Sequence, residues 1–277
     1  MPKPTQQGHH NCDGKGTELG LIVAMTNISK SYGEIKALDD VSFELGSNEV
    51  VGLLGDNGAG KSTLIKILAG VTRADAGTMH INGYHIDPRR HTVATARKLG
   101  IETVFQDKSL GEKQPLWRNF FVGRHLTNSW GFIDVAAEMR MTREILANIL
   151  GLQGSNLRPE TIAGTLSGGE RQGVAIGRAM HFNSRIVVLD EPTTALSLRE
   201  VDNVLAFVQR IKRDGKACIY ISHNINQVHA VADRFVIVDK GKIALDLPKD
   251  GTTLEELIKI MIHIADGQVP TWPGVHS

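Results

Sequence analysis

Alternating polar and apolar residues open the chain and predict β-strands. Residues 21–32 and 35–45 alternate around a tight turn, which is the pattern of strands with one buried face. A shorter hairpin follows over residues 77–86, where Asn82-Gly83 is a strong signal for a two-residue turn. Together these segments predict an antiparallel β layer in the first third of the chain.

A second pattern, short continuous apolar runs, predicts parallel strands that are buried on both faces. These runs lie at residues 49–54, 101–105, 186–189, 217–221 and 235–238. Segments with helical periodicity separate them, at residues 62–69, 91–98, 198–213 and 225–232, and a last helix is expected at 253–262. Strands that alternate with helices predict an α/β fold with a mostly parallel sheet.

The strand pattern is interrupted in the middle of the chain. Helices are expected there over residues 117–123 and 134–150, the second with apolar residues spaced three and four apart. We therefore expect a helical subdomain, at about 107–182, inserted into one domain that spans residues 21–263.

Composition narrows the class of protein. The 277 residues are 41% hydrophobic, which suffices for a large core, and the net charge of +1 favours neither nucleic acid nor anionic lipid. The two cysteines, Cys12 and Cys218, lie far apart, which indicates a reducing compartment and no disulfide. No apolar run approaches the roughly 18 residues of a membrane span. Residues 1–20 and 264–277 lack periodicity and are expected to form a disordered tail and a flexible tail.

One loop carries a strong chemical motif. Residues 55–63 fit the phosphate-loop pattern G-x-x-x-x-G-K-[ST], between a predicted strand and a predicted helix. Backbone N–H groups and the helix N-terminus would hold phosphate, Lys61 would reach the β- and γ-phosphates of ATP, and the Ser62 hydroxyl would ligate Mg²⁺. A glycine-rich turn that binds nothing is the alternative, which the flanking elements disfavour. The predicted ATP-binding residues here are Gly55, Asp56, Asn57, Gly58, Ala59, Gly60, Lys61, Ser62 and Thr63.

Two carboxylates follow a predicted buried strand. Asp190 stands where a phosphate-loop enzyme holds the Mg²⁺ shell, and Glu191 is placed to polarise the attacking water. A strand that merely ends in acidic residues at the surface is the alternative. The phosphate loop upstream favours the chemical interpretation.

A second glycine-containing segment resembles a known family. It reads Leu166-Ser167-Gly168-Gly169-Glu170, in which Ser167 is a natural N-cap for the helix that follows, so this is a second anion-binding helix terminus. With the two motifs above, the chain resembles the ATPase subunit of ATP-binding-cassette (ABC) transporters over about residues 21–241.

The resemblance implies further roles in ATP hydrolysis. Tyr32 matches the aromatic residue that stacks on adenine, although it could also pack on its own strand. Gln106 matches the glutamine that meets Mg²⁺ and the water. His223 matches the switch histidine that senses the γ-phosphate; a purely structural histidine is the alternative. The expected catalytic residues are Glu191, His223, Gln106 and Lys61, and the expected metal-binding residues are Ser62, Gln106 and Asp190.

One position departs from the family. Ser197 stands where the family often has Asp, and it forms a capping-box sequence with Glu200. In the family this Asp makes a contact across a dimer of two ATPase subunits, and the departure puts that contact in doubt.

The resemblance also implies partners. Residues 166–170 would complete the ATP site of a second copy, so a homodimer that encloses two ATP molecules is expected. An integral membrane permease would bind the helical subdomain, with an extracytoplasmic solute-binding protein as an indirect partner. The protein would then be peripheral at the cytoplasmic face of the bacterial inner (plasma) membrane. Four aromatic residues would line a groove for the permease or form the core of the subdomain: Trp117, Phe120, Phe121 and Trp130.

The residues that make up these motifs resemble those of ribose- and fructose-type carbohydrate importers. With its single phosphate loop, the chain resembles the single-cassette members of that group. We therefore expect an ATPase that powers sugar uptake. The main alternative is an ABC ATPase without a permease, acting on nucleic acid or ribosomes, but the chain shows no tandem cassette and no basic arm. An inactive regulatory cassette is disfavoured because the expected catalytic residues are present.

Overall fold

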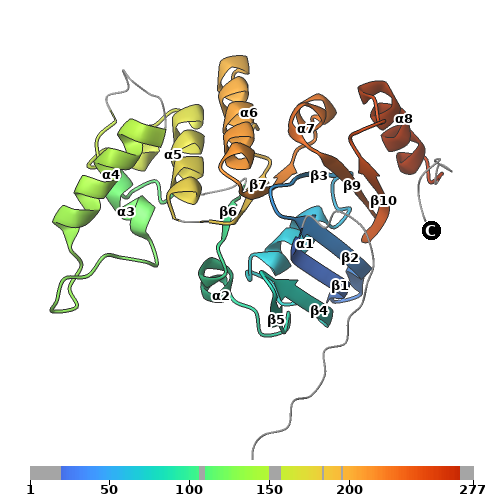
Figure 1. The fold of residues 1–277 in the computed structure, drawn as a ribbon, viewed down its shortest axis with the longest axis horizontal. Helices are drawn as coiled ribbons and strands as arrows, with labels where there is room; N and C mark the ends of the chain where they lie inside the picture. The colour runs from blue at the N-terminus through green and yellow to red at the C-terminus, as the bar shows by residue number, and fades with distance from the viewer. Residues whose placement is uncertain (1–19, 106–109, 150–156, 183, 195, 269–277) are drawn as a thin grey trace, which may run out of the picture.

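The computed structural model describes residues 20–105, 110–149, 157–182, 184–194 and 196–268. Two sheets and a helical subdomain are arranged side by side, with the helical subdomain at the left of Figure 1 and the antiparallel sheet at the lower right. The described part of the chain holds no helix of the length and apolarity that crossing a bilayer requires.

The antiparallel sheet contains the predicted hairpins. Its order is β2-β1-β4-β5, with β1 at Leu21–Tyr32, β2 at Ile35–Gly46, β4 at Ala76–Ile81 and β5 at Tyr84–Ile86. Asn82 and Gly83 have φ values of 50° and 79°, so both residues of the turn are left-handed, as a type I′ hairpin turn requires. The antiparallel layer predicted from alternation is confirmed.

The second sheet has six strands in the order β10-β9-β3-β8-β7-β6. These are β3 (Val50–Leu54), β6 (Ile101–Val104), β7 (Ile186–Asp190), β8 (Ala217–Ile221), β9 (Arg234–Asp239) and β10 (Lys242–Pro248). All neighbours pair in parallel except β9 and β10, so the predicted, mostly parallel sheet is confirmed. Cys218 lies buried in β8, where burial raises the pKa of its thiol, whereas Cys12 lies outside the described residues.

Strand β10 was not predicted from the sequence. Only Leu245 and Leu247 are buried in it, so its apolar signal is weak. A tight turn at Lys240-Gly241, where both residues have positive φ, folds it back on β9. Its place is therefore set by pairing with a neighbour, which local periodicity does not report.

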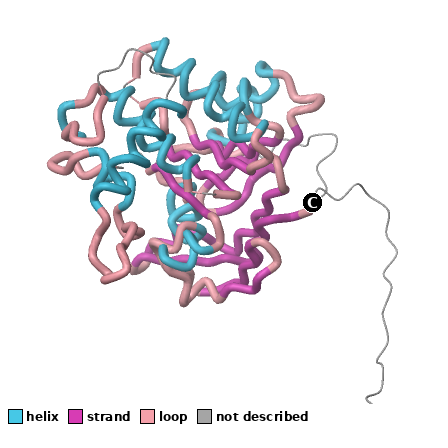
Figure 2. Tube along the Cα trace, turned by 60° about the vertical axis from the view of Figure 1, so that its left-hand side comes forward, coloured by secondary structure: helices cyan, strands magenta, loops and turns pink. Residues whose placement is uncertain are grey.

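Helices cover the six-stranded sheet on both faces. Helix α1 (Lys61–Leu68) lies in the core that also holds one face of the antiparallel sheet, and α2 (Val93–Lys98) borders the same core. The opposite face packs against α5 (Gly168–His181), α6 (Leu198–Arg213), α7 (Ile225–Val231) and α8 (Leu254–Ala265). Successive strand residues therefore enter different cores, which explains their unbroken apolar runs. Figure 2 shows helices above the upper group of strands and further helix between these strands and the lower group.

The helical subdomain has a small core of its own. It is built from α3 (Leu116–Phe121), α4 (Val135–Ile149), a 3₁₀ turn at Ala163–Thr165 and the start of α5. Phe120 and Phe121 are fully buried there, so for these two the core alternative is right and a groove-lining role is wrong. Trp117 is half-buried, and Trp130, in the loop before α4, is 84% exposed.

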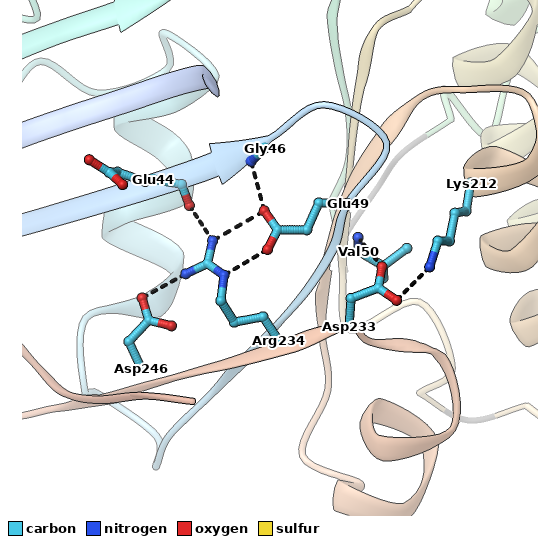
Figure 3. A network of polar contacts seen from close by, with 8 residues as sticks. All are labelled: Glu44, Gly46, Glu49, Val50, Lys212, Asp233, Arg234 and Asp246. Atoms are coloured by element: carbon cyan, nitrogen blue, oxygen red, sulfur yellow. Dashed lines mark hydrogen bonds and ion pairs between the residues drawn. The ribbon is translucent and has the colours of Figure 1, made fainter. Parts of the chain in front are cut away.

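A network around Arg234 joins the two sheets (Figure 3). Its guanidinium donates from Nε to Oε1 of Glu49 at 2.7 Å, from Nη1 to Oδ2 of Asp246 at 2.6 Å, and from Nη2 to the carbonyl oxygen of Glu44 at 2.8 Å. Burial lowers the pKa of Arg234, but its hydrogen bonds to Glu49 and Asp246 outweigh burial and raise the pKa overall. One side chain from β9 thus holds β2, the turn before β3, and β10 together.

Substitution of Arg234 by Met is expected to lower the free energy of unfolding by about 2–3 kcal/mol, because the mostly buried Glu49 carboxylate loses its charged partner. Chemical denaturation measures this change. Arg89→Ala, which removes an exposed pair with Asp87, is the control and should leave the unfolding midpoint unchanged. An unchanged midpoint for Arg234→Met would contradict the stabilising role.

Candidate functional site

A cavity of about 170 Å³ opens where three central strands end. The phosphate loop follows β3, Asp190 and Glu191 end β7, and His223 follows β8. Because β3, β8 and β7 are adjacent and parallel, their carboxyl ends meet at one edge of the sheet. Residues more than 160 positions apart in the sequence therefore line one cavity: Ala37, Asp56, Asn57, Gly58, Ala59, Gly60, Lys61, Ser62, Thr63, Asp190, Glu191, Ile221 and His223.

The phosphate loop depends on glycine at two positions. Gly55 and Gly60 have φ values of 139° and 116°, which other residues rarely adopt. A Cβ atom on Gly55 would lie 2.1 Å from the carbonyl oxygen of Val238, and one on Gly60 would lie 2.7 Å from that of Ala37. The loop is thus closely packed against its neighbours, and α1 starts directly from it with its N–H groups at the cavity.

Lys61 is held inside this loop. Its buried Nζ donates hydrogen bonds to the carbonyl oxygens of Gly55 at 2.6 Å and Asp56 at 2.9 Å. Burial lowers the pKa of Lys61, while the nearby charges of Glu191, Asp56 and Asp190 act in the opposite direction. The ammonium group is therefore positioned at the cavity by backbone contacts and can exchange them for the oxygens of an anion.

Glu191 combines a buried carboxylate with an uncommon backbone conformation. It is 7% exposed and has a φ of 50°, a left-handed conformation that is uncommon outside glycine. Its backbone N–H donates to the carbonyl oxygen of Ile221 at 3.0 Å, which ties the end of β7 to β8. Its Oε1 lies 3.1 Å from Nε2 of His223, and its Oε2 accepts a long hydrogen bond of 3.4 Å from the His223 N–H.

Burial raises the pKa of Glu191, and the charge of Asp190 raises it further, whereas His223 and Lys61 lower it. A carboxylate with a raised pKa is a stronger base, and proton acceptance from a water molecule requires its ionised form. The Glu191–His223 pair can therefore accept a proton and orient the group that donates it.

We expect His223→Ala to raise the pKa of Glu191 further, because the substitution removes an opposing charge but not the burial. The ionised fraction of Glu191 would then fall at a higher pH than in the parent protein. Carbon-13 NMR of labelled glutamate side chains measures this titration directly. His263→Ala, at an exposed site on α8, is the control; an unchanged Glu191 titration in His223→Ala would contradict the electrostatic coupling.

Two oxygen donors at the cavity suit a divalent cation. The Asp190 carboxylate, 7% exposed at the end of β7, and the Ser62 hydroxyl, at the start of α1, both line the cavity. Hard cations such as Mg²⁺ prefer carboxylate, hydroxyl and phosphate oxygens, so this donor set fits Mg²⁺. Within the described ranges no group of three or more His, Cys, Asp or Glu residues is placed to hold a metal ion. Gln106, the third predicted ligand, lies outside the described residues.

Tyr32 does not line the cavity. It ends β1 and is 49% exposed, with Nζ of Lys30 5.4 Å from its ring centroid. One part of its ring is therefore accessible for stacking. Its predicted contact with adenine remains a prediction.

Residues 166–170 form the capped N-terminus of helix α5, outside the cavity. Ser167 Oγ accepts from the Glu170 N–H at 3.2 Å, and Glu170 Oε2 accepts from the Ser167 N–H at 2.9 Å, so the predicted N-cap is confirmed as a capping box. Leu166 is buried in the subdomain core, whereas Ser167 and Gly168 are exposed. None of these five residues lines the cavity described above. Among the predicted site residues that the structure describes, a single chain therefore brings together the phosphate loop, the two carboxylates and His223.

Gln227 is a structural residue that the sequence pattern does not single out. Its Oε1 accepts hydrogen bonds from Thr193 Oγ1 at 2.7 Å and from the Tyr220 hydroxyl at 3.2 Å. It thus connects the loop after Glu191 to β8, next to His223. No local signal in the sequence could have indicated this role, because Gln227 and its two partners lie in three different parts of the fold.

Comparisons with known proteins agree with this arrangement. Residues 38–194 match the family model described as "ABC transporter". The chain is 39% identical over 249 residues to the xylose/arabinose import ATP-binding protein XylG of Sulfolobus acidocaldarius, covering 90% of the chain and 96% of that protein. It is 38% identical over 245 residues to the ribose import ATP-binding protein RbsA 1 of Burkholderia ambifaria, covering 87% of the chain but only 46% of that protein, so it spans about half the length of this relative.

Solved structures show the same fold. A nucleotide-free ATP-binding cassette from an ABC transporter aligns with a TM-score of 0.72 at 28% identity, over 88% of this chain and 95% of that one. The ADP conformation of an ATP-binding cassette aligns with a TM-score of 0.72 at 27% identity, over 90% of this chain and 100% of that one. The range of the family model, residues 38–194, includes the phosphate loop and both carboxylates.

Proposed function

Because the chain belongs to the ABC transporter family of ATPases, we propose that it binds and hydrolyses ATP to power an importer. The observation that carries this proposal is the cavity that combines the phosphate loop with the Glu191–His223 pair, 3.1 Å apart. A phosphate-binding loop beside a base of raised pKa suits hydrolysis of a phosphoanhydride.

Each side chain then has a role. Lys61 and the loop N–H groups bind the β- and γ-phosphates of ATP, and Ser62, Asp190 and Gln106 hold Mg²⁺, which neutralises phosphate charge. Glu191 accepts a proton from water as the water oxygen bonds to the γ-phosphorus and the bond from that phosphorus to the bridging oxygen breaks. His223 orients Glu191 and the γ-phosphate. The products are ADP and inorganic phosphate, and Tyr32 stacks on the adenine.

The functional unit is a homodimer. One chain presents a helix start at residues 166–170, with Ser167 and Gly168 exposed, that is not part of its own cavity. In a head-to-tail pair with two-fold symmetry, each copy places this helix start against the ATP of the other. ATP then holds the two copies together, and hydrolysis releases them.

The transported solute is a sugar, in keeping with relatives whose names specify xylose/arabinose and ribose import. A separate permease forms the pore, and an extracytoplasmic solute-binding protein delivers the sugar to it. The ATPase sits at the cytoplasmic face of the membrane and contacts the permease through its helical subdomain.

Purification of the membrane complex that contains this protein tests the proposal. We expect a permease in the complex, and ATPase activity that rises when its binding protein is loaded with one member of a panel of pentoses and hexoses. Recovery of nucleic acid or ribosomes without a permease would instead favour an ABC ATPase of the non-transport class.

Trp130 is the predicted aromatic residue best placed to contact the permease. It is 84% exposed in the loop before α4, beside Phe132, which is 71% exposed. We expect Trp130→Ser to weaken permease binding about 30-fold, because buried tryptophans at interfaces commonly contribute about 2 kcal/mol. Pull-down titration measures this, with the exposed Tyr84→Ser as a control. Equal permease binding by the Trp130→Ser and parent proteins would rule out the contact.

A further inference from the structure

We propose that Glu102, in β6, is a positioning residue that holds the helical subdomain at a fixed place relative to the ATP site. Through it, permease contact on the subdomain changes the geometry of the cavity where ATP is hydrolysed. The inference rests on the proposed function and adds to it a residue that lies outside the cavity. One buried carboxylate of the sheet faces arginines from α2, from the loop after α3 and from α5.

Glu102 forms a two-pronged ion pair with Arg124, which lies in the loop after α3. Arg124 donates from Nη1 to Oε1 of Glu102 at 2.6 Å and from Nη2 to Oε2 at 2.8 Å. Glu102 is 5% exposed, so the pair is largely shielded from water. Paired hydrogen bonds of this kind fix the relative orientation of two groups as well as their distance. The loop after α3 is therefore held to β6 in one orientation.

Arg124 is held on its other side by the helical subdomain. Its guanidinium carbon lies 3.6 Å from the centroid of the Phe182 ring, just after α5, in a cation–π contact. The Phe182 ring in turn meets the ring of Phe121 edge to face, with 5.6 Å between the two centroids. Phe121 is fully buried in the core of the subdomain. Arg124 thus joins this core to a strand of the six-stranded sheet.

Two further arginines act on the same cluster of charges. Arg178, on α5, donates from Nη1 to the carbonyl oxygen of Asn119 in α3 at 3.2 Å. Burial lowers the pKa of Arg178, Glu102 raises it, and the positive charges of Arg124 and Arg97 lower it further. Glu102 therefore offsets the repulsion among three positive charges. Its removal would leave buried charge without compensation, which strongly disfavours the arrangement.

The place of β6 in the sheet connects this cluster to the ATP site. Strand β6 pairs in parallel with β7, with Glu102 opposite Val187, and β7 ends at Asp190, directly before Glu191. On the subdomain side, the helix that carries Arg178 begins within residues 166–170, which the proposed dimer places at the ATP of the second copy. The cluster therefore joins both parts of the molecule that are assigned to ATP.

The cluster also meets the surface proposed to bind the permease. Arg124 begins the loop that carries the exposed Trp130. This loop is fastened to α4, because the fully buried Glu138 accepts from the Leu126 N–H at 2.9 Å and its Oε1 lies 3.0 Å from Nδ1 of His125. A displacement of Trp130 is therefore passed to Arg124 through a chain of hydrogen-bonded contacts, and from Arg124 to Glu102.

Spin labels on the subdomain and on the main core test the positioning role. Arg143→Cys on α4 and Ala206→Cys on α6 provide exposed attachment sites. Cys12→Ser removes a competing thiol, whereas Cys218 is buried in β8. Pulsed electron paramagnetic resonance then measures the distribution of distances between the two labels. This readout requires neither ATP nor a permease.

We expect Glu102→Gln to widen the distribution of distances, because the arginines lose the charge that holds them together. Arg124→Lys keeps the positive charge but cannot form the paired hydrogen bonds, so it should widen the distribution less. If Glu102→Gln does not fold, Arg124→Lys decides the question. Arg234→Met is the matched control, because it breaks another ion pair, one that joins the two sheets, and should leave the distribution unchanged.

The same substitution is expected to weaken coupling between the permease and hydrolysis. In the membrane complex, sugar-loaded binding protein raises the ATPase rate, and Glu102→Gln should reduce this rise about tenfold, a factor typical of coupling between sites. The affinity for ATP and the basal rate should stay close to those of the parent protein, because Glu102 does not line the cavity. Arg234→Met should keep the rise.

The outcomes separate the two proposals. If folded Glu102→Gln or Arg124→Lys shows the parent distribution of distances, or if Arg234→Met widens it equally, the positioning role is wrong. If the distribution widens in Glu102→Gln but the rise in ATPase rate is unchanged, the link to the permease is wrong. If the parent complex contains no permease, the proposed function fails, and the distance measurement still decides the role of Glu102.

Discussion

Glu191→Gln is expected to reduce the ATP turnover rate by about 10³-fold while leaving ATP binding intact. The amide keeps the shape of the side chain but cannot accept the proton of the attacking water, and general-base catalysis commonly contributes 10²- to 10⁴-fold. The phosphate loop keeps its own contacts, because Lys61 is held by the carbonyl oxygens of Gly55 and Asp56. ATP would therefore stay bound and unhydrolysed, and the dimer would accumulate.

Two measurements check this expectation. Steady-state phosphate release reports turnover, and light scattering with ATP and Mg²⁺ reports the dimer. Glu255→Gln, at an exposed site in the first turn of α8, is the matched control and should resemble the parent protein in both assays. A Glu191→Gln protein that remained monomeric at high concentration with ATP would contradict the proposed sandwich, and one with full turnover would exclude Glu191 as the base.

Lys61→Ala is expected to act before hydrolysis, by weakening ATP binding roughly 30-fold to several thousand-fold. Loss of one partner from a buried, charge-assisted contact costs about 2–5 kcal/mol, which corresponds to roughly 30-fold to several thousand-fold in affinity. The carbonyl oxygens of Gly55 and Asp56 also lose their donor, so the loop would bind phosphate less well even where its own N–H groups remain.

Calorimetric titration with ATP and Mg²⁺ measures this loss. Lys66→Ala is the control, because Lys66 lies on the same helix but is exposed and does not line the cavity. Thermal unfolding of both variants shows whether the fold survives. Parent-like affinity in a folded Lys61→Ala protein would contradict the role of the ammonium group.

Local patterns in the sequence were sufficient to predict most of the strands and helices of the fold. Alternation predicted both long strands of the antiparallel sheet, and Asn82-Gly83 predicted the hairpin because a type I′ turn needs two left-handed residues, which Asn and Gly tolerate. Continuous apolar runs predicted the central strands because these face two different cores. The phosphate loop and the N-cap at Ser167 could be predicted for the same reason, since each depends on contacts between residues close in sequence.

Tertiary structure alone decided how these parts meet. The sequence could place Glu191 and His223 at strand ends, but only the strand order brings them within 3.1 Å, because β7 and β8 are neighbours in the sheet. The same holds for β10 and for the Arg234 network. Pairing and packing between distant segments leave no periodic signal in either segment, so the sequence determined the elements and their local chemistry, and the assembly of the sheet determined the site.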